Sequence, residues 1–263
     1  MNVLQARILK TGSKGKIQLM KILLSIITLF VLLGTQSSAD WSLDLESGLV
    51  SCGYNDVQIP GGLGTKVSLT DALSVQSKEY YRVRATKALS SDKYISVLYS
   101  PLTLVASGVL ATGVNYNGDS FAAGASINAK YRFDSYRVTY YKIFNAGKRY
   151  SYKLGFTAKI RDAAILLSDG NKYSEKKNTG FVPLLNFGVN YDFTPKLALV
   201  VDGDALAGGP GRAEDVLIAL GYKAGRDHTL RLGYRFVEGG ADTKEVYSFA
   251  LLNYISVAVI LNF

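Results

Sequence analysis

Hydrophobic and polar residues alternate with a period of two along most of the chain after residue 40. Residues 254–263 give the clearest case, because every second position is a branched aliphatic residue and Ile260 alone falls out of phase. The same alternation marks residues 150–161, 181–193 and 230–236, where the second phase carries charged, amide or glycine residues. This period is typical of β-strands with two different faces. No stretch of 18 apolar residues follows residue 40, which argues against a helical membrane protein.

Polar breaks divide this pattern into strands. Short breaks fall at 90–93, 145–149, 194–196 and 223–228, and mostly longer ones at 52–77, 107–120, 168–180, 208–211 and 239–245. A transmembrane barrel has short periplasmic turns and longer outer loops, so the two sets fit its two ends. The breaks predict an all-β, antiparallel barrel of about ten strands, at 41–52, 78–89, 94–106, 121–144, 150–167, 180–193, 197–207, 212–222, 229–238 and 246–263. If one hairpin within 53–135 lies outside the membrane, the number falls to eight.

The charged phase is expected to face the lumen. A Lys or Arg that faces lipid at mid-depth costs about 2–4 kcal/mol. In a soluble β-sandwich the apolar phase would instead point inward, and alternation alone does not separate the two cases. Opposite charges inside a narrow barrel are expected to pair with one another. The expected lumen charges are Arg82, Arg84, Arg137, Lys153, Lys159, Arg231 and Arg235.

The N-terminal region predicts export. Residues 22–33 form an apolar run after Lys21, shorter than the roughly 20 residues that span a bilayer. Small residues at Ser37 and Ala39 fit a signal-peptidase site, so cleavage is expected after Ala39. Residues 1–39 would be an upstream extension plus a secretory signal peptide, and 40–263 the barrel. The alternative is a membrane-anchoring helix.

Removal of this leader changes the charge argument. Five of the 30 basic residues precede the cleavage site and none of the 21 acidic ones does, which leaves 25 − 21 = +4. The basic character therefore belongs largely to the leader, and it is poor evidence for nucleic-acid binding. No nucleic-acid partner is expected.

The last residues carry a family resemblance. The terminal Phe263, with Leu261 and Val259 behind it, resembles the C-terminal signature of bacterial outer-membrane proteins. That resemblance implies recognition by the barrel-assembly machinery, although an aromatic is commoner where Leu261 stands. Residues 40–263 as a whole resemble Gram-negative outer-membrane β-barrels, which implies location in the cell outer membrane. Four segments also resemble an uncharacterised barrel family, to which no activity is attached: 157–163, 181–185, 202–206 and 238–242.

One charged cluster is expected at the outer mouth. Its members are Arg161, Asp202, Asp204, Arg212, Asp215 and Glu238. Carboxylates that converge there could bind Ca²⁺ or transfer protons, and they could equally form a solvated rim paired with the arginines. The spacing of a calcium-binding helix–loop–helix motif is absent from the sequence.

The sequence gives little support for histidine-dependent hydrolysis or for zinc binding. His228 is the single histidine, and it falls in a predicted periplasmic turn, whereas known outer-membrane barrel hydrolases use a histidine on the outer side. Cys52 is the single cysteine, so a zinc site is not expected. We predict no cofactor, no metal and no catalytic residue.

The expected function is that of a non-catalytic outer-membrane barrel. It would be either a narrow pore or a barrel that binds a small solute or lipid, with outer-membrane lipid as its surroundings. The alternative is a surface-exposed enzyme or metal-binding barrel that uses the outer-mouth cluster. A soluble periplasmic β protein is a third hypothesis.

Overall fold

The computed structural model describes residues 40–263, so the predicted signal peptide lies outside the described residues. Ten long strands form one antiparallel barrel, with β5 and β6 acting as two halves of one strand. The strands are β1 (Trp41–Gln58), β4 (Lys78–Ala88), β5 (Lys93–Ser100), β6 (Thr103–Val109), β9 (Ser126–Phe144), β10 (Tyr150–Ser168), β11 (Tyr173–Asp192), β12 (Leu197–Gly208), β13 (Gly211–Lys223), β14 (His228–Asp242) and β15 (Tyr247–Asn262). This architecture confirms the expected fold class.

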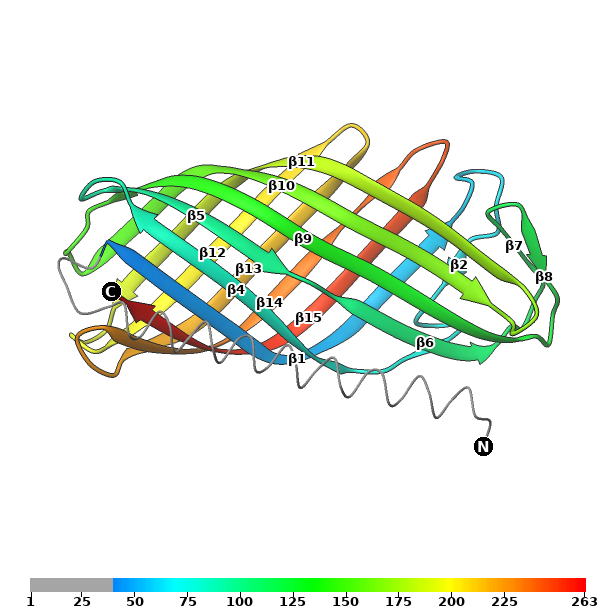
Figure 1. Cartoon of the computed structure of the whole chain (residues 1–263), viewed down its shortest axis with the longest axis horizontal. Helices are drawn as coiled ribbons and strands as arrows, with labels where there is room; N and C mark the ends of the chain where they lie inside the picture. The colour runs from blue at the N-terminus through cyan, green and yellow to red at the C-terminus, as the bar shows by residue number, and fades with distance from the viewer. Residues whose placement is uncertain (1–39) are drawn as a thin grey trace. The chain divides into compact units, whose positions relative to one another are not determined.

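Neighbouring strands in the barrel follow chain order, and the last strand closes on the first. β15 pairs with β1 over its whole length, and β9 pairs with both β10 and the β5–β6 strand. β5 faces residues 135–142 of β9, and β6 continues the ladder along 126–132. The region 53–135 thus contributes complete barrel strands, and the barrel has ten strands rather than eight. Figure 1 shows these strands inclined to the long axis.

A belt of apolar side chains covers the outside of the barrel. On β10 the exposed phase runs from Tyr150 through Phe156 to Ile160, and Asp162 is the next residue of that phase. The belt therefore covers ten residue steps, about 33 Å along a strand. At a tilt of roughly 45° this gives about 23 Å of height, close to the ~25 Å apolar band of outer-membrane barrels. Within residues 40–263 no helix is long and apolar enough to cross a membrane.

The two ends of the barrel differ. Short turns and the C-terminus lie at one end, which we name the turn end, and the longer connections lie at the other, the loop end (Figure 1). The walls at the loop end are uneven, since β10 and β11 have 19 and 20 residues but β12 and β13 only 12 and 13. In Figure 1 the β12–β13 hairpin accordingly stops well short of the end reached by β10 and β11.

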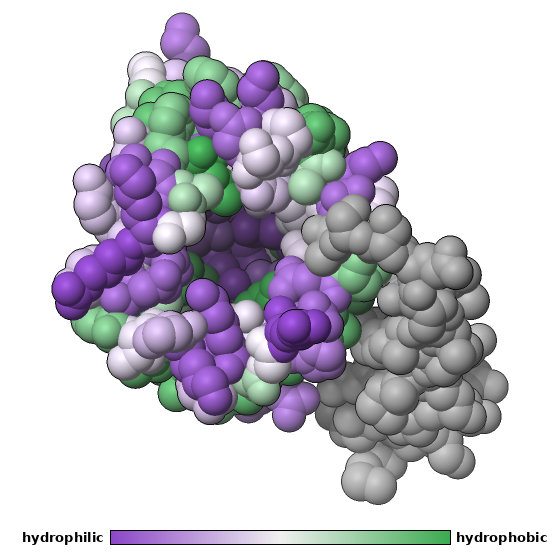
Figure 2. Space-filling view, turned by 90° about the vertical axis from the view of Figure 1, so that its left-hand side faces the viewer, coloured by the Kyte–Doolittle hydropathy of each residue, from purple (hydrophilic) through white to green (hydrophobic). Residues whose placement is uncertain are grey.

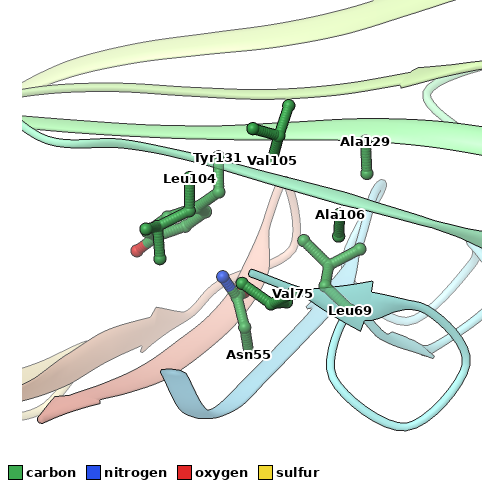
Figure 3. Close-up of a pocket in the computed structure, with 8 residues that line it drawn as sticks. All are labelled: Asn55, Leu69, Val75, Leu104, Val105, Ala106, Ala129 and Tyr131. Carbon is green, nitrogen blue, oxygen red and sulfur yellow. The ribbon is translucent and has the colours of Figure 1, made fainter. Parts of the chain in front are cut away.

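The two long loops fold into the loop end and fill one side of the lumen. The β1–β4 connection carries β2 (Val67–Ser68) and β3 (Ser74–Val75), and it inserts Leu69 against residues of β6 and β9 (Figure 3). The β6–β9 connection forms the hairpin β7 (Val114–Tyr116) and β8 (Asp119–Phe121). The hydroxyl of the fully buried Tyr116 donates a hydrogen bond to the Ile165 carbonyl at 2.8 Å. These apolar contacts leave the lumen beside β10–β14 unfilled.

Candidate functional site

The lumen on the turn-end side is filled by a network of buried ion pairs. Its centre is Asp215 on β13, which accepts bonds from Arg82 at 2.9 Å, Arg137 at 2.7 Å and Arg235. These cations come from β4, β9 and β14, so side chains from distant parts of the wall meet in the middle. All four residues are 3% exposed. Charges this deep are stable only when paired, as they are here.

A second carboxylate, Glu46 on β1, extends the network along the wall, directly beside Arg82 of β4. It accepts from Arg235 and Arg231 at 2.8 and 2.9 Å, and the Tyr80 hydroxyl donates to it at 3.0 Å. Arg231 also pairs with Asp44 at 2.7 Å. Glu46 is 4% exposed, so its oxygens lie well below either mouth.

The β12 carboxylates complete the network. Asp204 accepts from Arg137 at 2.7 Å, and the Thr157 hydroxyl and the Asn186 amide donate to it at 2.6 and 2.8 Å. Asp202 accepts from two cations, Arg84 at 2.8 Å and Lys153 at 2.7 Å. Six cations thus meet five carboxylates inside the barrel: Arg82, Arg84, Arg137, Lys153, Arg231 and Arg235 against Asp44, Glu46, Asp202, Asp204 and Asp215.

The network fills the part of the lumen that it occupies. Figure 2 looks at the turn end, where a hollow leads inward and has hydrophilic side chains at its bottom. The residual space among Asp44, Glu46, Arg82 and Arg84 is about 10 Å³, roughly one water molecule. At this point the ion pairs leave no room for a solute larger than water.

Beside the network, on the loop-end side, lies a cavity of about 490 Å³. Its walls come from β10 and β11, from the β12–β13 hairpin and from the β14–β15 connection. Most of its lining is apolar, including Phe133, Ile165, Val182 and Leu206. Ligand pockets commonly have ~300–1,000 Å³ and combine an apolar lining with a few polar groups. The cavity therefore has the size and lining of a site for a small ligand.

Small residues line one wall of the cavity. The β12–β14 wall presents Gly208, Gly211, Gly239 and Gly240 to it, together with alanines at 213 and 241. A Cβ at Gly211 would come within 2.1 Å of the Gly240 carbonyl oxygen, so β13 and β14 approach too closely there for any side chain. Gly239 and Gly240 are equally close to backbone oxygens of neighbouring strands, and of these four glycines only Gly208 borders open space.

The polar groups of the cavity are predominantly cationic. Lys159, Arg161, Lys176 and Arg212 line it with two carboxylates, a balance of 4 − 2 = +2. One of these carboxylates, Glu238, is already bound by Arg212 at 2.8 Å. The cavity therefore favours an anionic ligand.

Lys159 is the most unusual of these cations. It is 3% exposed, and no carboxylate of residues 40–263 lies within ion-pair distance of its Nζ, which sits 4.7 Å from the centre of the Phe133 ring. Its neighbour Arg161 donates to the Asn178 side chain, while its Nε is buried without a hydrogen-bond partner in the described part of the chain. An unpaired buried cation is costly, so these two side chains form a ready site for an anion.

The structure corrects the predicted outer-mouth cluster. Asp202, Asp204 and Asp215 lie buried in the network instead of at the mouth, because the short β12–β13 hairpin ends low in the wall. Arg212 and Glu238 do lie near the loop end, where Tyr54 also donates to Glu238. Arg161 lines the same cavity as Arg212 and Glu238, from the β10 side. Of the expected lumen charges, all but Lys159 belong to the ion-pair network.

Groups suited to other chemistry are sparse. No three His, Cys, Asp or Glu residues within 40–263 are placed to hold a metal ion. His228 begins β14 at the turn end, far along the strand from the cavity-lining glycines. Each carboxylate of the predicted acidic cluster has a cationic partner. The sequence did not single out Lys176 or the small-residue wall, because neither forms a motif.

Comparison with known proteins extends to the fold. No family model and no curated protein matches the sequence. Among solved structures, the outer-membrane protease OmpT from Escherichia coli aligns with a TM-score of 0.53 and 10% identity, over 88% of this chain and 99% of that one. Ail of Yersinia pestis and the COG4313 outer-membrane channel from Pseudomonas putida F1 align at 0.38 and 0.41, with 9% and 10% identity, over 85% and 87% of this chain and 99% and 97% of theirs.

The fold and the apolar belt define the class. This is an integral β-barrel of the Gram-negative outer membrane, as the sequence predicted. Because the fold is shared with a protease, it does not by itself decide whether the protein is an enzyme.

Proposed function

We propose that this barrel binds an amphiphile with an apolar chain and an anionic head group, and that it has no catalytic role. The observation that carries the proposal is Lys159, a buried cation without a carboxylate partner in the described residues, facing a largely apolar cavity. Of the two expected functions, the binding barrel is favoured over the narrow pore, since the ion-pair network fills the lumen.

The chemistry follows from the two parts of the cavity. A phosphate or carboxylate beside Lys159 and Arg161 would accept charge-assisted hydrogen bonds from their N–H groups, including the Arg161 Nε that has no acceptor among the described residues. An alkyl chain would contact the apolar lining around Val182 and Leu206. A cationic head group would instead add to the existing positive charge.

Binding of a simple probe tests this function. Purified, folded protein in an uncharged detergent would be titrated with dodecyl phosphate and, separately, with dodecyltrimethylammonium, and bound probe counted by native mass spectrometry. We expect dodecyl phosphate to bind and the cationic probe not to. Lys159→Met should weaken dodecyl phosphate at least about tenfold, the loss of one charged hydrogen bond. Lys159→Arg should retain binding.

A matched control lies on β11, facing away from the cavity. Lys177 on β11 is exposed and follows the cavity-lining Lys176, but its side chain points to the other face of the strand. Lys177→Met should bind dodecyl phosphate like the wild type. The proposal fails if Lys159→Met, shown to be folded by its gel mobility before boiling, binds dodecyl phosphate with unchanged affinity.

A further inference from the structure

Strand pairing is interrupted between β11 and β12 beside the cavity. The ladder between these strands begins at Asp192↔Ala198 and ends at Leu185↔Ala205. β11 continues for twelve residues beyond that point, still paired with β10 on its other side, and β12 continues to Gly208. We name the unpaired edges 181–184 of β11 and 206–208 of β12 the β11–β12 gap.

The β11 edge of the gap lies at the level of the apolar belt. Phe181 and Pro183 belong to the outward phase of β11, and Phe181 is 64% exposed. Thr179, the next residue of that phase, pairs with Asp162, where the belt ends on β10. Pro183 has no N–H for a neighbouring strand, which fits a strand edge without a ladder. The β11 edge of the gap is therefore placed to contact lipid.

The cavity reaches both edges of the gap. Phe181, Val182 and Pro183 line it from β11, and Leu206 and Gly208 line it from β12. The same hollow that holds Lys159 thus extends to a break in the wall at the outer edge of the apolar belt. An unpaired seam is also the part of a barrel that opens with the least loss of hydrogen bonds.

We infer that the β11–β12 gap is a lateral entry, through which an acyl-chain amphiphile passes between the outer leaflet and the cavity. This inference rests on the proposed function and adds the source of the ligand, the membrane. The chain would slide between Phe181 and Leu206 while the anionic head group approaches Lys159 and Arg161. No transit along the barrel axis is needed.

Closing the gap with a cross-link tests the route. In a Cys52→Ser background, cysteines would be introduced by Pro183→Cys and Ala207→Cys, the two positions that would face each other two residue pairs beyond the end of the ladder. A bismaleimide would then join them. Protein loaded with dodecyl phosphate would be cross-linked, placed in phosphatidylcholine vesicles, and its retained probe followed over time. We expect release at least tenfold slower than from the same variant without the cross-linker. A control pair, Leu220→Cys and Leu232→Cys, spans a seam that is already paired and should release at the uncross-linked rate.

A second pair of variants covers the case in which the cross-link does not form. A side chain at Gly208 or at Gly209 would meet no atom within 4 Å, but only Gly208 lines the cavity. Gly208→Trp should slow uptake of dodecyl phosphate from vesicles at least tenfold, whereas Gly209→Trp should not.

The outcomes separate the two proposals. Unchanged release from the cross-linked protein, or equal uptake by the two Trp variants, would overturn the lateral route while leaving the binding function standing. Failure of dodecyl phosphate to bind the wild type in detergent would instead remove the binding function itself.

Discussion

Asp215→Asn is the sharpest test of the buried network. The substitution keeps the size of the side chain but removes the charge that holds Arg82, Arg137 and Arg235 together. All three cations would remain buried, with four carboxylates left for six cations. Removing one partner from a buried ion pair typically costs about 3–5 kcal/mol. We expect a loss of this size in the free energy of unfolding.

Urea unfolding in lipid vesicles, followed by gel mobility without boiling, measures this loss. Asp162→Asn is the matched control, because Asp162 pairs with Arg132 on the outer face, where both side chains are about 30% exposed. An exposed pair contributes roughly 0–1 kcal/mol. If Asp215→Asn is too unstable to fold, the double variant Asp215→Asn/Arg82→Gln should regain stability, since it removes one stranded cation. Equal losses for Asp215→Asn and Asp162→Asn would refute the reasoning.

Two further predictions concern the belt and the lumen. Phe156→Lys places a charge in the middle of the belt, at a position 69% exposed, and should lower the free energy of unfolding by about 2–4 kcal/mol in vesicles; stability equal to the wild type would show that the belt is misplaced. In planar bilayers the wild-type protein should give no steady conductance, because ion pairs fill the lumen; regular single-channel openings would contradict a closed lumen.

The polar breaks placed some strands within one residue of their observed ends. Strands were expected at 150–167 and 197–207 and are observed at 150–168 and 197–208. The largest error is β11, expected from residue 180 but beginning at Tyr173. Residues 174–178 are all polar, so no alternation marks them, and they are paired with β10 above the belt. The alternation of apolar and polar residues marks the strand segments that contact lipid, and it therefore misses segments that extend into water.

The site was harder to predict than the strands. The lumen charges followed from the cost of facing lipid, and their side chains do point inward. The depth of each charged side chain along the barrel axis could not be predicted from the sequence, because it depends on how far each hairpin extends toward the loop end. Asp204 and Asp215 lie four residues from the ends of a short hairpin, a position that resembles a mouth in sequence but is buried in the structure. The cavity could not be predicted either, because no sequence motif marks the residues that border it.

Unequal strand lengths account for the misplaced carboxylates and for part of the unpaired seam. The 20-residue β11 has only eight residues paired with the 12-residue β12, which separates from β11 after Ala205 and ends at Gly208. That low hairpin carries Asp204 and Asp215 down into the network, and it also leaves the upper part of β11 without a neighbour on one side. β12 itself runs on from Leu206 to Gly208 without pairing with β11, so the β11 edge is unpaired first where the two strands diverge and then above the hairpin, where β12 has ended.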